Sequence, residues 1–352
     1  MSRVNSVLLP AATVVVSVVA LLLLAGTNPW DPLKIIVEGS IGWPPLEGGA
    51  ARKVGDTFMV WVPIALASAG LIVTFNAGMW NIGIEGQIIM GAIAAAWMAR
   101  EVSAPRPLLI LLTIVAGAVG GMLWGLLAGV LRTAGGVNEI FGGLGLNFVA
   151  LSLTTYLIIG PWARSGVAST SGTDPFPEDA WLPALEGTKL SPLAVVIALL
   201  ALIGVWLLFR GTLYGLKLKA VGRNRPSSFL LGIPTNRYLL GAFMICGALA
   251  GIGGTSQALG LHHKLIPAIS GNFGYLAILV VLLARFRPFW VIPISFFFAM
   301  IAVGSPSLQL RVDVNPTLGG VLQGVLVLSA MFGLGWAGYR ALREASSAGV
   351  ES

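Results

Sequence analysis

Long apolar runs alternate with short polar segments along the whole chain. Runs of about 20 apolar residues can each cross the hydrocarbon core of a bilayer as a helix. We expect about ten such spans, at residues 7–25, 58–75, a third that ends near 99, 108–131, 138–159, 192–209, 238–259, 273–284, 289–303 and 318–336. The pattern predicts an all-α fold, with one polytopic helical bundle that occupies residues 1–352.

The composition supports this fold class. Of the 352 residues, 56% are hydrophobic and only 10% are charged, whereas soluble domains contain about 25% charged residues. A soluble fold is therefore excluded. Cys246 is the single cysteine, so no intramolecular disulfide can form, and the two histidines are adjacent at His262 and His263. Because a metal site needs more convergent ligands than this pair, we expect solvated histidines and no metal.

The distribution of charge predicts the orientation in the membrane. The segment 210–237 contains six basic residues and no acid: Arg210, Lys217, Lys219, Arg223, Arg225 and Arg237. Lys and Arg in short connecting segments favour the cytoplasmic side. We therefore expect a cytoplasmic loop here, two cytoplasmic termini, and outer loops at 26–57 and 161–191. The net charge of +7 then reflects topology and implies no nucleic-acid partner.

One polar stretch, residues 74–91, interrupts the apolar pattern between two spans. It contains Asn76, Trp80, Asn81, Glu85 and Gln87, with glycines at 78, 83 and 86. A carboxylate at membrane depth costs several kcal/mol and usually faces a bundle interior or a wet cavity. Two interpretations stay open: a short polar turn with Glu85 at the water interface, or a broken segment beside a solute path. We favour the second, and we add Asn147, inside the span at 138–159, to the path.

Four glycines recur at four-residue spacing in the span at 108–131: Gly117, Gly121, Gly125 and Gly129. Such a stripe allows another helix backbone to approach closely. Glycine is also generally common in membrane helices, so a plain glycine-rich helix is the alternative. We expect close packing against another helix of this chain or of a partner subunit.

Motifs for catalysis are missing from the sequence. No G-x-x-x-x-G-K-[ST] sequence occurs, so the chain cannot form a P-loop of its own. The segment 333–338 reads GLGWAG, but it closes a membrane helix and follows no strand, which excludes a dinucleotide site. No Ser/His/Asp or Cys/His set is indicated. We expect no catalytic residue and no cofactor bound by this chain.

The basic segment has two possible roles. It could serve only to fix the topology, or it could contact a soluble partner. Pro226 can begin a short amphipathic helix, and such a helix would dock in the cleft of a cytoplasmic protein. The contact residues that we expect between 221 and 233 are Gly222, Arg223, Asn224, Ser227, Ser228, Phe229, Leu230 and Gly232.

Three stretches resemble the membrane permeases of bacterial ABC importers, in the branch that serves ribose and other simple sugars, branched-chain amino acids and nucleosides. They read FNAGMWNIGIEGQ, TLYGLKLKAVGRNRPSSFLLGI and GNFGYLAILVVLLARFRP. The first is similar to the motif of the sugar and nucleoside permeases, the second to the family's coupling segment, and the third is a looser match. Ser227 and Ser228 stand where alanines are usual, Ala284 replaces a glycine, and an acid often found in the third stretch is missing.

The resemblance implies a division of labour among several proteins in the bacterial inner membrane. A separate ATP-binding subunit, which holds ATP and magnesium, would drive this chain through the coupling segment. A second, paralogous permease subunit would complete the path in the lipid bilayer, and an extracytoplasmic binding protein would deliver nucleosides or simple sugars. Trp80 could stack on a base or sugar face, and Asn81 lies four residues from Glu85, on the same helical face if the helix continues there.

Two other classes of protein remain as alternatives. A self-contained, ion-coupled secondary transporter would be built from inverted repeats with broken helices, and the similar triplets Asn81-Ile-Gly83 and Asn272-Phe-Gly274 hint at such a repeat. A membrane-embedded enzyme that acts on a lipid-linked substrate is the third class, and no catalytic constellation supports it.

Overall fold

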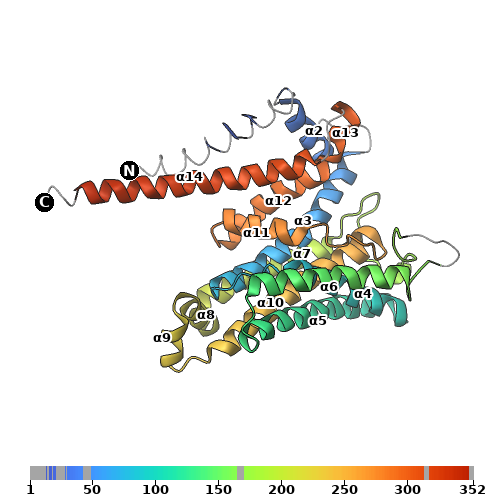
Figure 1. Ribbon diagram of the computed structural model, residues 1–352. Helices are drawn as coiled ribbons and strands as arrows, with labels where there is room; N and C mark the ends of the chain where they lie inside the picture. The colour runs from blue at the N-terminus through green and yellow to red at the C-terminus, as the bar shows by residue number, and fades with distance from the viewer. Residues whose placement is uncertain are drawn as a thin grey trace. The chain divides into compact units, whose positions relative to one another are not determined.

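The computed structural model describes residues 30–42, 49–164, 170–312 and 317–348, together with a few isolated positions before residue 29. This part of the chain contains helices and no strand (Figure 1). The all-α prediction is therefore confirmed. The span expected at 7–25 lies largely outside the described residues.

The helices are α2 (Trp30–Ile41), α3 (Ala50–Asn76), α4 (Ile84–Glu101), α5 (Arg106–Thr133), α6 (Glu139–Ile159), α7 (Pro192–Gly211), α8 (Leu213–Arg223), α9 (Arg225–Leu230), α10 (Thr235–Ser256), α11 (Phe273–Leu283), α12 (Pro288–Gly304), α13 (Pro306–Val312) and α14 (Leu318–Ala348). A short 3-10 helix occupies Glu178–Ala180, and a π-helical turn, Gln257–His262, continues α10.

Among the described residues, six helices are long and apolar enough to cross a membrane: Ala50–Asn76, Arg106–Thr133, Glu139–Ile159, Pro192–Gly211, Thr235–His262 and Pro288–Arg311. Two further helical segments, Phe273–Leu283 and Leu318–Gly333, are also apolar but shorter. The prediction of a multi-span helical protein is thus supported, while the total of about ten spans and the side of each terminus stay predictions.

The chain divides into two compact units, residues 54–299 and residues 1–53 with 300–352. In the larger unit, α10 packs along α5 and α4, and α6 packs on α4. In the apolar 18-residue stretch of α3, 89% of the residues are buried. Helix α3 is therefore a central element of this unit. In the smaller unit, an apolar cluster joins the helices: Ile35, Ile36, Ile301, Leu308 and Leu322.

The glycine stripe of α5 lies against α10 of the same chain. A Cβ added at Gly121 would overlap the carbonyl oxygen of Gly247, and one at Gly125 would overlap that of Phe243. Gly117 likewise faces Thr255 and Gly251, and Gly129 faces Leu240 and Phe243. At Gly121 and Gly125 the two backbones therefore approach directly, with no side chain between them.

Three helices lie where the sequence predicted loops. The segment 26–57, predicted as a polar loop, contains α2 and the first turns of α3, and α13 follows the span at 289–303. The basic segment contains α8 before the short helix expected after Pro226. Thr212 caps α8 by accepting a hydrogen bond from the Gly215 amide at 3.0 Å, a local signal for a helix start.

Candidate functional site: a buried polar network at a helix break

Helix α3 stops at Asn76, and α4 begins only at Ile84. The Gly78 backbone adopts the left-handed conformation, with φ of 73°. The Met79 amide donates to the Thr74 carbonyl at 3.0 Å, and the Gly78 amide donates to the Phe75 carbonyl at 3.0 Å. This is the Schellman motif, in which a glycine ends a helix and satisfies its last carbonyls. The expected break is therefore present, with a specific local cause.

Asn81 and Gln87 pair with each other across the break. The Asn81 Nδ2 donates to Gln87 Oε1 at 3.2 Å, and the Gln87 Nε2 donates to Asn81 Oδ1 at 3.1 Å. Both side chains are fully enclosed, with 1% and 0% exposure. The condition for Asn81 and Glu85 to share a helical face is not met, because α4 starts after Asn81, and the Asn81 amide pairs with Gln87 instead. A second contact joins Asn81 Nδ2 to the sulfur of Cys246 in α10, at 3.1 Å.

Glu85 lies in the first turn of α4 and is only 5% exposed. Its Oε2 accepts a hydrogen bond of 2.7 Å from the Gly274 amide, at the start of α11. Helix N-termini attract negative charge, and this carboxylate meets two of them. Its Oε1 is buried and has no hydrogen-bond partner among the described residues. This burial disfavours the interpretation of Glu85 as an interfacial residue.

Asn147 of α6 ties the break to two other helices. Its Oδ1 accepts from the Gly86 amide at 2.8 Å, while its Nδ2 donates to the Ile82 carbonyl at 3.0 Å and to the Tyr275 hydroxyl at 3.2 Å. Buried polar groups need such partners, since each group left unpaired costs about 1–3 kcal/mol. The structure thus brings Asn81, Glu85, Gln87 and Asn147 together around one break.

Two of the expected path residues lie outside this buried network. The Asn76 Nδ2 donates to the Ile72 carbonyl at 2.8 Å, and Asn76 borders a cavity of about 300 Å³ with Phe209 and Lys219. Trp80 is 44% exposed, and its ring packs on Phe75 with a centroid separation of 5.0 Å.

Sequence reasoning missed several members of the network, namely Cys246, Gly274 and Tyr275. A signal for the last two was present. The triplet Asn272-Phe-Gly274 parallels Asn81-Ile-Gly83, and Asn272 adopts the left-handed conformation just before α11. Cys246 had no signal, because an apolar run in α10 surrounds it. Among the described residues, no group of three His, Cys, Asp or Glu side chains could hold a metal ion.

The basic segment forms two short helices joined at Asn224. The Asn224 side chain caps α9 by accepting from the Ser227 amide at 3.0 Å, and Ser228 is buried at 3% exposure. The tip beyond them is strongly apolar and open: Phe229 is 68% exposed and Leu230 85%. Arg223 is exposed at the end of α8, and Gly232 takes a positive φ of 75° where the chain turns toward α10.

Gly222 connects this segment to the break. A Cβ added at Gly222 would overlap the carbonyl oxygen of Asn76 and would lie 2.9 Å from the Gly78 amide nitrogen. The backbone of α8 therefore touches the end of α3 directly. Because no side chain cushions this contact, a displacement of α8 must also displace the start of the break.

Comparisons with known proteins agree with these features. Residues 54–331 match the family described as "Branched-chain amino acid transport system / permease component". The chain is 31% identical over 277 residues to the glucose ABC transporter permease protein TsgB13 of Haloferax volcanii, covering 76% of this chain and 73% of that protein. It is 28% identical to the nucleoside ABC transporter permease protein NupB of Lactococcus lactis, covering 78% and 81%. It is 25% identical to the guanosine ABC transporter permease protein NupP of Bacillus subtilis, covering 80% and 81%.

No solved structure matches the chain. The family match spans most of the described residues, and it includes both the break and the basic segment. The chain belongs to the branched-chain amino acid transport system permease family, whose members are membrane subunits of ABC transporters.

Proposed function

We propose that this chain is the permease subunit of an ATP-driven importer for nucleosides or related simple sugars in the bacterial inner membrane. The observation that carries the proposal is the direct backbone contact between Gly222 in α8 and the end of α3 at Asn76. It gives an ATPase bound at the basic segment a short mechanical route to the buried polar network. The names of the similar proteins supply the solute class.

The chemistry of the break suits neutral, hydroxyl-rich solutes. Asn81, Gln87 and Asn147 offer amides, and Glu85 offers a carboxylate with one unpartnered oxygen. In the closed arrangement of this structure, the amides satisfy one another. When the break opens, the same donors and acceptors would face the solute, since unpaired buried groups are costly. Trp80 lies outside the buried network, and its ring, 44% exposed, could stack on a base or a sugar.

We assign to partner subunits the functions for which this chain has no motif. The sequence contains no P-loop, so ATP and magnesium would be held by a separate ATP-binding subunit. The exposed Phe229 and Leu230 side chains are the surface that we assign to that subunit. A second permease subunit would complete the path, as the named pair NupB and NupC in Lactococcus lactis suggests. An extracytoplasmic binding protein would deliver the solute. This coupling works only if the outward-open and inward-open states of the permease differ in their contacts with the nucleotide-bound ATPase.

Uptake of labelled inosine, uridine, ribose and glucose, in cells with and without the gene, tests the solute class. We expect the uptake of one class to depend on this chain and on ATP. Uptake that follows a proton or sodium gradient in liposomes holding this chain alone would instead favour the secondary transporter.

A second experiment tests the assigned ATPase surface. Leu230→Asp changes an open side chain, so the permease should still insert, while copurification of the ATPase and uptake should both fall by about tenfold or more. Leu185→Asp is the matched control, because Leu185 is also exposed, at 51%, but lies in the segment at 161–191. Normal uptake by the Leu230 variant would contradict the assignment.

A further inference from the structure

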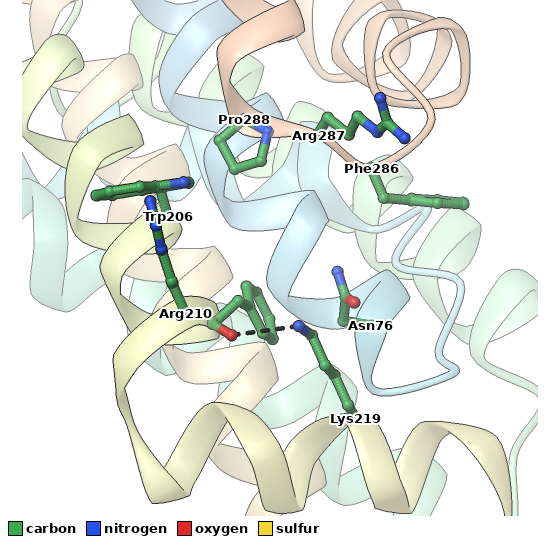
Figure 2. A pocket seen from close by; sticks show the side chains of 8 residues that line it. Asn76, Trp206, Arg210, Lys219, Phe286, Arg287 and Pro288 are labelled. Carbon is green, nitrogen blue, oxygen red and sulfur yellow. Dashed lines mark hydrogen bonds between the residues drawn. The ribbon is translucent and has the colours of Figure 1, made fainter.

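A cavity of about 300 Å³ lies beside the junction of α8 with α3. Its wall combines the last residue of α3, the end of α7, one side chain of α8 and the turn before α12 (Figure 2). The lining residues are Asn76, Trp206, Phe209, Arg210, Lys219, Phe286, Arg287 and Pro288. Three are cations, three are aromatic, and none is an acid.

The cations have no acidic partner in the part of the chain that the structure describes. The Arg210 guanidinium lies 4.8 Å from the centre of the Trp206 ring, and the Lys219 Nζ donates to the Phe209 carbonyl at 3.2 Å. An ammonium has three N–H donors and a guanidinium has five, so these contacts use only part of their capacity. Figure 2 shows the Lys219 ammonium and the Asn76 side chain next to each other, below Phe286 and Arg287. Neighbouring cations repel one another, and an anion between them would remove that repulsion.

The surroundings of the cavity are suited to an apolar tail. The Trp206 ring meets Phe289 edge-on with a centroid separation of 5.4 Å. The neighbouring face of α7 exposes Leu200, Ile203 and Leu207 by 60%, 46% and 50%. Tryptophan and basic residues together at the end of a spanning helix are typical of a membrane–water interface.

We propose that this cavity binds the phosphate of an anionic phospholipid, with its acyl chains along the exposed face of α7. The shared chemistry is a phosphate ester, which Arg and Lys bind by charge-assisted hydrogen bonds. A soluble phosphate compound could supply the same group, but it would leave the apolar face of α7 uncovered. The lipid site goes beyond the proposed function. Only the assignment of the site to the cytoplasmic leaflet rests on the proposed function. Asn76 and Lys219 belong to the two helices that meet at Gly222, so an occupied site would brace α8 against α3.

Native mass spectrometry of the purified chain tests the proposal. The chain is incubated with equal amounts of phosphatidylglycerol and phosphatidylcholine that carry the same acyl chains. We expect the wild-type chain to retain the anionic lipid preferentially. Each of Arg210→Gln and Lys219→Gln should reduce that preference by about fivefold, the value of one basic residue near an anionic surface.

Lys217→Gln is the matched control, since Lys217 is exposed on the same helix but does not line the cavity. It should keep the preference of the wild type. Arg287→Gln, on an exposed turn, provides a third variant if a substitution at Lys219 disturbs folding, and it should also reduce the preference. Equal retention of both lipids by the wild type, or an equal loss in the Lys217 variant, would overturn the proposal. Displacement of phosphatidylglycerol by excess glycerol 3-phosphate would overturn the lipid as the source of the phosphate. Uptake is not measured, so failure here is distinct from failure of the transport proposal.

Discussion

Gly222 of α8 packs its backbone against the carbonyl group of Asn76, the last residue of α3. Gly222→Ala is the smallest change that enters this contact. Alanine is more favourable than glycine inside a helix by about 1 kcal/mol, so the substitution alone should stabilise α8. The added methyl group, however, would overlap backbone, which typically costs about 1–3 kcal/mol. We expect α8 to shift away from the break, with uptake reduced by about tenfold and membrane insertion retained.

ATP hydrolysis by the assembled transporter should continue in this variant while uptake falls, which is the signature of uncoupling. Gly211→Ala is the control, because nothing lies within 4 Å of a Cβ added at Gly211. Parallel loss of hydrolysis and uptake in the Gly222 variant, or equal effects of both substitutions, would argue against a mechanical contact at this position.

The stripe on α5 gives a second prediction. A side chain at Gly121 or Gly125 would overlap the backbone of α10, so Gly121→Leu and Gly125→Leu should each lower stability by about 1–3 kcal/mol or more. Val119→Leu, on the open face of α5 where Val119 is 40% exposed, should leave the thermal unfolding midpoint in detergent unchanged. Parent-like melting of both glycine variants would mean that the two helices do not pack closely in the membrane.

A double-mutant cycle can distinguish a structural role of the Asn81–Gln87 pair from a role in transport. Asn81→Ala leaves the Gln87 amide buried without a partner, and Gln87→Ala leaves the Asn81 amide with only its contact to the Cys246 sulfur. Each should cost about 1–3 kcal/mol, and the double variant should lose less than the sum, by about 1–3 kcal/mol. If these amides also meet the solute, uptake by the double variant should stay about tenfold low, a loss worth roughly one hydrogen bond. Recovery of both stability and uptake would show a purely structural pair.

We expect His263 to make the stability of the fold depend on pH. It lies just beyond the span that ends at His262, and its ring stacks on Trp181 with a centroid separation of 4.0 Å. Burial, with the nearby Lys189 charge, lowers the pKa of His263, although its hydrogen bond to the Leu259 carbonyl opposes this shift. A lowered pKa in the folded state means that the unfolded chain binds the proton more readily. The resulting stability is present above the unfolded pKa of about 6.5 and is lost as the pH falls through the folded pKa.

Thermal unfolding between pH 8 and pH 5 measures this effect. His263→Asn removes the titrating ring, and asparagine tolerates the positive φ at this position. The midpoint of the variant should therefore fall less steeply with acid than that of the wild type. Lys189→Gln should also weaken the slope, since it removes one cause of the lowered pKa. Identical slopes for all three proteins would contradict the assignment.

The helical spans could be predicted from the sequence because the apolar length sets them. The span expected at 192–209 is observed as Pro192–Gly211, and the glycines of α5 face α10 of the same chain. The short helices α2, α8 and α13 were missed because each is shorter than a membrane span and contains charged residues, so the sequence predicted connecting loops there. The partners of the site could not be predicted either. Asn81 pairs with Gln87 only because Gly78 ends α3 in the left-handed conformation, and the Gly274 amide reaches Glu85 only through tertiary packing.

The central claim is that the break between α3 and α4 opens onto the solute path under the control of the ATPase. Glu85→Cys, in a Cys246→Ala background, tests it most directly in the assembled transporter, because position 85 is 5% exposed in the present conformation. A small polar thiol reagent should label position 85 slowly without nucleotide, and at least about tenfold faster in one nucleotide-bound or solute-bound state, a population shift of roughly 1.4 kcal/mol. Equally slow labelling in every state would make the network a fixed structural core, equally fast labelling would make it a solvated turn, and either result would contradict the account.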